Sequence, residues 1–142
     1  MDTKTIDLVQ ASWAKVMPMK VVAGKLFYDN LFEADPSLKP LFKGDMEQQA
    51  AKLVLMINAA VNKLTDLSTL VPVLQQLGQR HETYGVQPAH YATVGAALLK
   101  TLGQGLGGDF TDDVEQAWAE VYGVMVGVMS PEVKSYSKLP FN

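Results

Sequence analysis

The sequence contains no cysteine, and this absence excludes several kinds of chemistry at once. Without thiols the chain cannot form disulfides, bind a metal through thiolates, hold an iron–sulfur cluster or use a cysteine nucleophile. Histidine is scarce as well, because the 142 residues include only His81 and His90. Any metal binding or acid–base chemistry that needs an imidazole must therefore use one of these two residues.

Long apolar runs and basic clusters are also missing. The stretch 121–129 is among the longest apolar runs, and it falls far short of the roughly 20 residues that span a bilayer. The N-terminus has no charged-then-apolar leader, so we expect a cytoplasmic protein without membrane contact. The 12 basic residues are scattered and the net charge is -3, which argues against a nucleic-acid partner.

What the sequence does contain is helical periodicity along almost its whole length. Apolar residues make up 48% of the chain and recur mostly at spacings of three and four, while no stretch alternates as a strand would. No repeat or linker divides it. We therefore predict one all-α domain over residues 1–142, with about seven helices.

Capping residues and prolines predict where these helices begin and end. Thr3 is the expected N-cap of the first helix, and Asp35-Pro36 is expected to open a short one. The glycine-rich segment 103–108 is interpreted as a helix end followed by a loop. The longer helices are expected at about 19–32, 45–64, 66–85, 87–102 and 111–131. In the helix expected at about 19–32, one face carries Val21, Gly24, Tyr28 and Leu31.

His81 follows a stripe of leucines, Leu70, Leu74 and Leu77, on one helix face. A histidine in such a place is usually a core residue whose ring nitrogens have ordinary partners. The alternative is a haem packed against the stripe, with iron on one nitrogen and a backbone carbonyl accepting from the other. His90, beside Pro88 at a helix start, is interpreted as a solvated or capping residue.

Tyr28 and Gln49 are expected to face inward from two different helices. Buried side chains of these types need hydrogen-bond partners, so they either bond each other or the backbone, or both face a polar ligand. Their spacing leaves these alternatives open. Lys52, three residues after Gln49, is by itself typical of a surface lysine with a buried stem.

Several segments together resemble a known family. They are Phe27-Tyr28-Asp29-Asn30-Leu31-Phe32, Asp35-Pro36 through Leu41-Phe42, Leu77-Gly78-Gln79-Arg80-His81, Tyr84-Gly85-Val86, His90-Tyr91, Ala117-Trp118 and Val121-Tyr122-Gly123-Val124. In this order they resemble bacterial single-domain haemoglobins, which are similar to the haem domain of flavohaemoglobins. The resemblance covers essentially the whole chain and implies a globin fold packed around a buried, non-covalent haem b.

The resemblance also implies a role for individual residues. His81 corresponds to the proximal iron ligand, and Phe42 to the phenylalanine that packs flat against the haem. Tyr28, Gln49 and Leu53 correspond to the distal pocket, where the ligand binds. Lys52 is then placed to meet a haem propionate, and Leu77, Val86 and Tyr91 are placed to contact the haem from the proximal side.

These roles imply tight binding of oxygen and other diatomic ligands. Hydrogen bonds from a tyrosine and a glutamine to a partly negative bound ligand slow its release, which favours scavenging, storage or detoxification over a shuttle. The alternative is a nitric oxide dioxygenase that works with a separate reductase, because the sequence ends at Asn142 without a reductase domain. A further alternative is a helical interaction module without a cofactor.

One position departs from the family. Its reactive members place a glutamate late in the last helix, next to the proximal histidine and a tyrosine equivalent to Tyr91. Here Glu132 comes one residue earlier and Val133 occupies the aligned position. A shift of one residue turns a helical side chain by about 100°, so we do not assign this network.

Overall fold

The computed structural model describes residues 1–42, 44–83 and 89–129, and for residues 81–83 the backbone alone. Over these ranges the chain forms six α-helices and three short 3-10 helices, without a strand. The α-helices are α1 (Thr3–Val16), α2 (Lys20–Ala34), α3 (Met46–Asn62), α4 (Leu67–Thr83), α5 (His90–Leu106) and α6 (Asp112–Met129). The 3-10 helices are η1 (Met17–Met19), η2 (Pro36–Leu41) and η3 (Gly107–Asp109). The predicted all-α class is confirmed, and the short helix expected after Asp35-Pro36 is η2.

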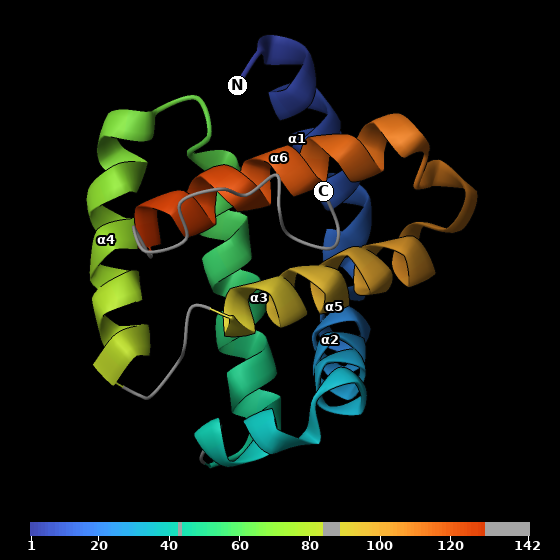
Figure 1. Ribbon diagram of the computed structural model, residues 1–142. Helices are drawn as coiled ribbons and strands as arrows, with labels where there is room; N and C mark the ends of the chain where they lie inside the picture. Colours follow the sequence, from blue (N-terminus) through green and yellow to red (C-terminus); the bar gives the residue numbers. More distant parts are fainter. Residues whose placement is uncertain (43, 84–88, 130–142) are drawn as a thin grey trace.

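The helices pack in crossed layers, as Figure 1 shows. In that view α5 and α6 lie across the front, and α1, α2 and α3 lie behind them. α2 packs against both α5 and α3, while α1 packs against α6. α4 stands at one side of the molecule and packs against α6. Within the described ranges, no helix is both long and apolar enough to cross a membrane.

Two tryptophans tie the layers together in the core. The rings of Trp13 on α1 and Trp118 on α6 are both buried, with their centroids 5.9 Å apart. The Trp118 indole N–H donates to the Ser12 hydroxyl at 2.8 Å, and that of Trp13 donates to the Asn58 side-chain oxygen at 3.0 Å. Buried indoles keep their full apolar contribution only when the N–H has such a partner. These bonds therefore fix α1 against both α6 and α3.

Three expectations about local structure are wrong. The N-cap of α1 is Asp2, whose carboxylate accepts the Thr5 N–H at 2.8 Å, while Thr3 is already helical. α5 continues through the glycine-rich segment to Leu106, and only Gly107, with φ 56°, ends it. Val21 is 72% exposed and does not belong to the buried face of α2.

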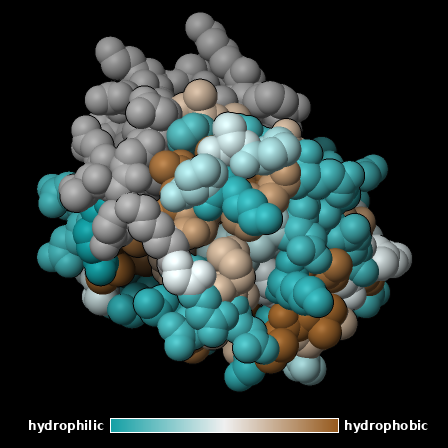
Figure 2. Space-filling model, turned by 90° about the horizontal axis from the view of Figure 1, so that it is seen from below, coloured by the Kyte–Doolittle hydropathy of each residue, from teal (hydrophilic) through white to brown (hydrophobic). Residues whose placement is uncertain are grey.

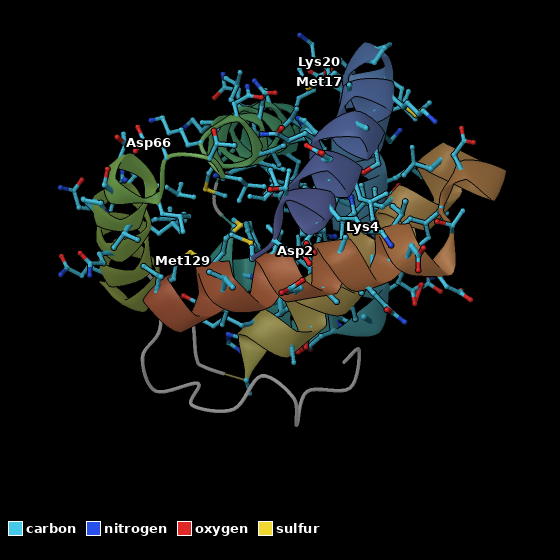
Figure 3. All side chains as sticks on the ribbon, turned by 90° about the horizontal axis from the view of Figure 1, so that it is seen from above. Asp2, Lys4, Met17, Lys20, Asp66 and Met129 are labelled. Atoms are coloured by element: carbon cyan, nitrogen blue, oxygen red, sulfur yellow. The ribbon has the colours of Figure 1, made fainter. Side chains whose placement is uncertain are left out.

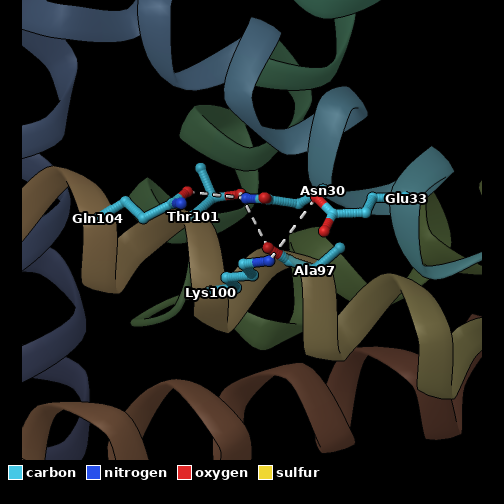
Figure 4. Close-up of polar contacts among 6 residues, drawn as sticks. All are labelled: Asn30, Glu33, Ala97, Lys100, Thr101 and Gln104. Carbon is cyan, nitrogen blue, oxygen red and sulfur yellow. Dashed lines mark hydrogen bonds and ion pairs between the residues drawn. The ribbon is translucent and has the colours of Figure 1, made fainter.

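A buried polar network joins α2 to α5 (Figure 4). The Asn30 side-chain amide donates to the Thr101 hydroxyl at 3.1 Å and to the Gln104 side-chain oxygen at 2.9 Å. Thr101 in turn donates to the Ala97 carbonyl at 2.8 Å. Because buried polar groups are costly when unpaired, this network favours one register between the two helices. It fixes the position of α2 two residues beyond Tyr28.

Gly78 marks the closest approach of α4 to α6. A Cβ atom built at Gly78 would overlap the carbonyl oxygen of Met129 and come within 2.8 Å of the Met129 Cα atom. Figure 3 shows Met129 at the end of α6, beside α4. The glycine therefore serves a helix-to-helix contact that backbone atoms make directly.

Replacing Gly78 with alanine is expected to lower the free energy of unfolding by about 2 kcal/mol, because overpacking outweighs the gain in helix propensity. The matched control is Gly127→Ala on α6, where a Cβ atom would have no neighbour within 4 Å. That control should gain about 0.5–1 kcal/mol. Urea unfolding of the two variants checks the opposite signs. A Gly78→Ala protein as stable as the control would contradict the close contact.

Candidate functional site

The candidate site is built around Tyr28, which α2 holds in an aromatic cluster. Its ring is 7% exposed and contacts three phenylalanines. The centroid of Phe27 lies 5.2 Å away, that of Phe32 5.8 Å and that of Phe42 5.2 Å. Phe32 follows Tyr28 by four residues, about one helical turn. Phe42 is the C-cap residue that directly follows η2. The structure therefore brings together Tyr28 and Phe42, two of the residues that sequence analysis selected.

The Tyr28 hydroxyl has no hydrogen-bond partner among the described residues. Burial raises the pKa of the Tyr28 hydroxyl to about 12. The group therefore stays protonated at neutral pH and is available as a donor. A buried donor without a protein partner carries a free-energy cost of about 1–3 kcal/mol unless something else accepts from it. Sequence analysis left two interpretations of Tyr28 open. In the first, its hydroxyl bonds Gln49 or the backbone, and no such bond is found among the described residues.

α3 carries three further candidates. Gln49 lies at the end of its first turn and is partly buried, and its backbone N–H donates to the Asp45 carbonyl at 3.1 Å. Leu53, one turn later, is partly buried and packs against the core. It also lines a small cavity of about 20 Å³, together with Phe27 and Leu98. The side chain of Lys52 is exposed, which fits an ordinary surface lysine as well as a cation at the edge of a pocket.

The leucine stripe on α4 has the predicted orientation. Leu70 and Leu74 are each 3% exposed and belong to the core, and Leu77 is partly buried. His81 lies in the last turn of this helix, which ends at Thr83. The side chain of His81 lies outside the described residues, as do Val86, Glu132 and Val133. The roles proposed for His81 and Val86 and the register of Glu132 therefore stay predictions.

Tyr91 begins the inner face of α5 and is 6% exposed. Its carbonyl accepts a hydrogen bond of 2.7 Å from the hydroxyl of Tyr122 on α6. This bond satisfies the buried Tyr122 phenol and joins the start of α5 to the middle of α6. The expected inward position of Tyr91 is thus observed, and the hydrogen bond adds a reason for it that the sequence did not show.

These residues fit a cofactor that carries a polar ligand. The Tyr28 hydroxyl has no acceptor among the described residues, and the neighbours of its ring are aromatic. A flat apolar macrocycle packs well against such rings, and a ligand bound to its metal can accept the hydrogen bond. The aromatic surroundings of the Tyr28 hydroxyl, with Phe42 at 5.2 Å, are therefore chemically suited to a haem and its ligand.

Comparison with known proteins decides the family. A profile of the globin family matches residues 25–129, which is more than half of the chain. The chain belongs to the globin family. Neuroglobin from Tetraodon nigroviridis is 34% identical over 144 residues, covering 92% of this chain and 91% of that protein. Neuroglobin from Danio rerio is 35% identical over 141 residues, covering 89% of each.

A solved globin structure agrees over almost the whole length. It is an engineered carbene transferase, a putative nitric oxide dioxygenase from Rhodothermus marinus. The two chains superpose with a TM-score of 0.83 at 28% identity, covering 93% of this globin and 92% of the other. Family membership supports haem-based gas binding. The predicted globin fold is confirmed.

Sequence reasoning missed two parts of the site's surroundings. Phe32 packs on Tyr28, and the spacing of four residues on one helix was a signal for this contact. The Asn30 network that holds α2 was also missed, because its partners lie 71 and 74 residues away in sequence. The only signal for this network in the sequence was Asn30, an asparagine inside a predicted helix.

Proposed function

We propose that this globin binds a non-covalent b-type haem through His81 and uses it to bind oxygen or another diatomic ligand tightly. The observation that carries the proposal is the buried Tyr28 hydroxyl, which is a proton donor without a partner among the described residues. When bound, the haem supplies one iron atom at which a gas molecule can bind reversibly. A ligand held there would give the hydroxyl the acceptor that it needs.

The protein's own residues then have separate tasks. Phe42 and Leu53 exclude water from the distal side, while Tyr28 and Gln49 donate hydrogen bonds to the bound ligand. Lys52, whose side chain is exposed, pairs with a propionate at the edge of the pocket. Leu77, Val86 and Tyr91 support the opposite side. Tight binding of this kind suits scavenging, storage or detoxification in the cytoplasm better than rapid exchange.

A second candidate function is nitric oxide dioxygenation with a separate reductase. The similarity to a putative nitric oxide dioxygenase from Rhodothermus marinus motivates it, although the similarity fits the binding function equally well. We place the chain, on the segments quoted above, among the bacterial single-domain haemoglobins that resemble flavohaemoglobin haem domains. In this second function the protein by itself only binds its ligand. It acts as an enzyme when a separate reductase supplies electrons.

Two measurements test these functions in turn. Titration of the purified protein with haem should give a saturating Soret band at one haem per chain, and the reduced form should bind oxygen reversibly. Absence of a saturating band would refute the haem proposal. It would support the alternative of a helical interaction module without a cofactor. Nitric oxide is then added repeatedly with a reductase present. Many turnovers support the dioxygenase, whereas a single stoichiometric reaction leaves the binding function alone.

A further inference from the structure

An open groove lies between α2 and α3, on the surface of the molecule. Its volume is about 690 Å³, within the range of about 300–1,000 Å³ typical of small-molecule sites. The walls are mostly apolar: α2 contributes Val21, Tyr28 and Phe32, and α3 contributes Met46, Val54 and Leu55. Because Tyr28 belongs to this wall, the groove borders the candidate site. The groove is therefore large enough and apolar enough to bury a flexible hydrocarbon chain.

Part of this apolar wall is open to solvent. Val21 is 72% exposed and Leu55 is 64% exposed, although both are large aliphatic side chains. Figure 2 views the molecule from below and shows brown hydrophobic patches between teal hydrophilic side chains on that face. Large exposed apolar side chains that gather around one depression indicate a binding surface more often than isolated ones do.

Positive charges stand along the same groove. Lys20, Lys25 and Lys39 all line it. The ion pairs observed among the described residues involve Lys4, Lys15 and Lys100, so none of the three groove lysines is paired within that part of the chain. Asp29 and Glu47 also line the groove, which leaves the cations in excess by three to two. A ligand with one negative charge would bring this cluster to neutrality.

We propose that the groove binds a fatty acid, with its chain along the apolar walls and its carboxylate among Lys20, Lys25 and Lys39. A small polar anion would use the lysines but leave the walls exposed, and a neutral hydrocarbon would use the walls alone. A fatty acid uses both, because amphipathic lysines can pack their stems on apolar surface while the ammonium groups meet a carboxylate.

A chain-length series tests the apolar half of the proposal. Calorimetric titration of the full-length protein with octanoate, decanoate and dodecanoate, each below its micellar concentration, should show one site. The affinity should rise roughly fourfold for each added methylene while the groove still has room. Dodecanol, which lacks the charge, should bind about tenfold more weakly than dodecanoate if the lysines act together.

Matched variants locate the site. Replacing Lys20, Lys25 and Lys39 with glutamine should weaken dodecanoate binding about tenfold. The same change at Lys4, Lys15 and Lys100, which do not line the groove, should leave it unchanged. Ala51→Phe fills the groove and should weaken binding at least tenfold, whereas Ala59→Phe, at another exposed position of α3, should not. Circular dichroism confirms that all four proteins are folded.

Three results would overturn the proposal. They are absence of saturable binding, binding that Ala51→Phe and the groove lysine variant leave unchanged, and equal affinity for dodecanol and dodecanoate. The protein is also sedimented with vesicles that contain an anionic phospholipid. Binding to these vesicles without binding of monomeric dodecanoate would show that the surface contacts a membrane, and would equally refute the fatty acid site.

Discussion

Replacing His81 with alanine is expected to abolish axial ligation of the haem, the largest single effect we predict. Loss of a residue that only supports a metal ligand commonly lowers metal affinity by about 10–100-fold, so loss of the ligand itself should exceed that range. The Soret band should shift and broaden, and the haem should transfer readily to an acceptor protein. Haem transfer rates and ferrous spectra of wild type and variant measure the change.

The chain offers a matched control in His90, because these are its only two histidines. His90 begins α5, and His90→Ala should retain the wild-type spectrum and haem transfer rate. A His81→Gly protein is tested with added imidazole, which should restore the wild-type ferrous spectrum if only the ligand is missing. A spectrum unaffected in His81→Ala, or lost in His90→Ala instead, would show that His81 is not the iron ligand.

The parts of the fold that follow from short-range chemistry could be predicted from the sequence. Asp45 caps α3 by accepting the Glu47 N–H at 2.9 Å, and Thr111 accepts the Val114 N–H at 3.3 Å at the start of α6. Both bonds join residues at most three positions apart, so the residue types alone indicate them. The buried stripe of α4 is predictable for the same reason, because helical periodicity is local.

The parts that depend on distant partners could not be predicted in this way. Gly103 lies inside α5, and a Cβ atom there would lie 3.3 Å from the ring of Phe110. This close contact favours glycine at the position, and no local pattern reveals it. Val21 matched the apolar face of α2, but the helix turns that residue into the open groove against α3. The candidate site itself was found through family resemblance. The spacing of Tyr28 and Gln49 in the sequence fitted a bond to protein groups and a position facing a ligand equally well. The missing hydrogen-bond partner of Tyr28 became visible only once the surroundings of the ring were known.

Replacing Tyr28 with phenylalanine is expected to speed oxygen release from the haem-loaded protein by about tenfold to 150-fold. That range corresponds to the roughly 1.5–3 kcal/mol contributed by a hydrogen bond to a charged or strongly polarised acceptor. The substitution keeps the ring contacts with Phe32 and Phe42 and removes only the hydroxyl. Stopped-flow mixing of the oxygenated protein with carbon monoxide or dithionite measures the dissociation rate.

The same hydroxyl sets the expected pH dependence. Its pKa is raised to about 12, so the donor keeps its proton below the ordinary tyrosine pKa of 10.0 and loses it only as the pH rises through 12. The wild-type rate of oxygen release should therefore stay constant between about pH 6 and 10. Tyr122→Phe is the control, because that hydroxyl already donates to the Tyr91 carbonyl. It should change the rate less than about twofold, in line with a hydrogen bond that does not reach the ligand. If Tyr28→Phe released oxygen as slowly as this control, the buried hydroxyl would have to serve something other than the bound gas.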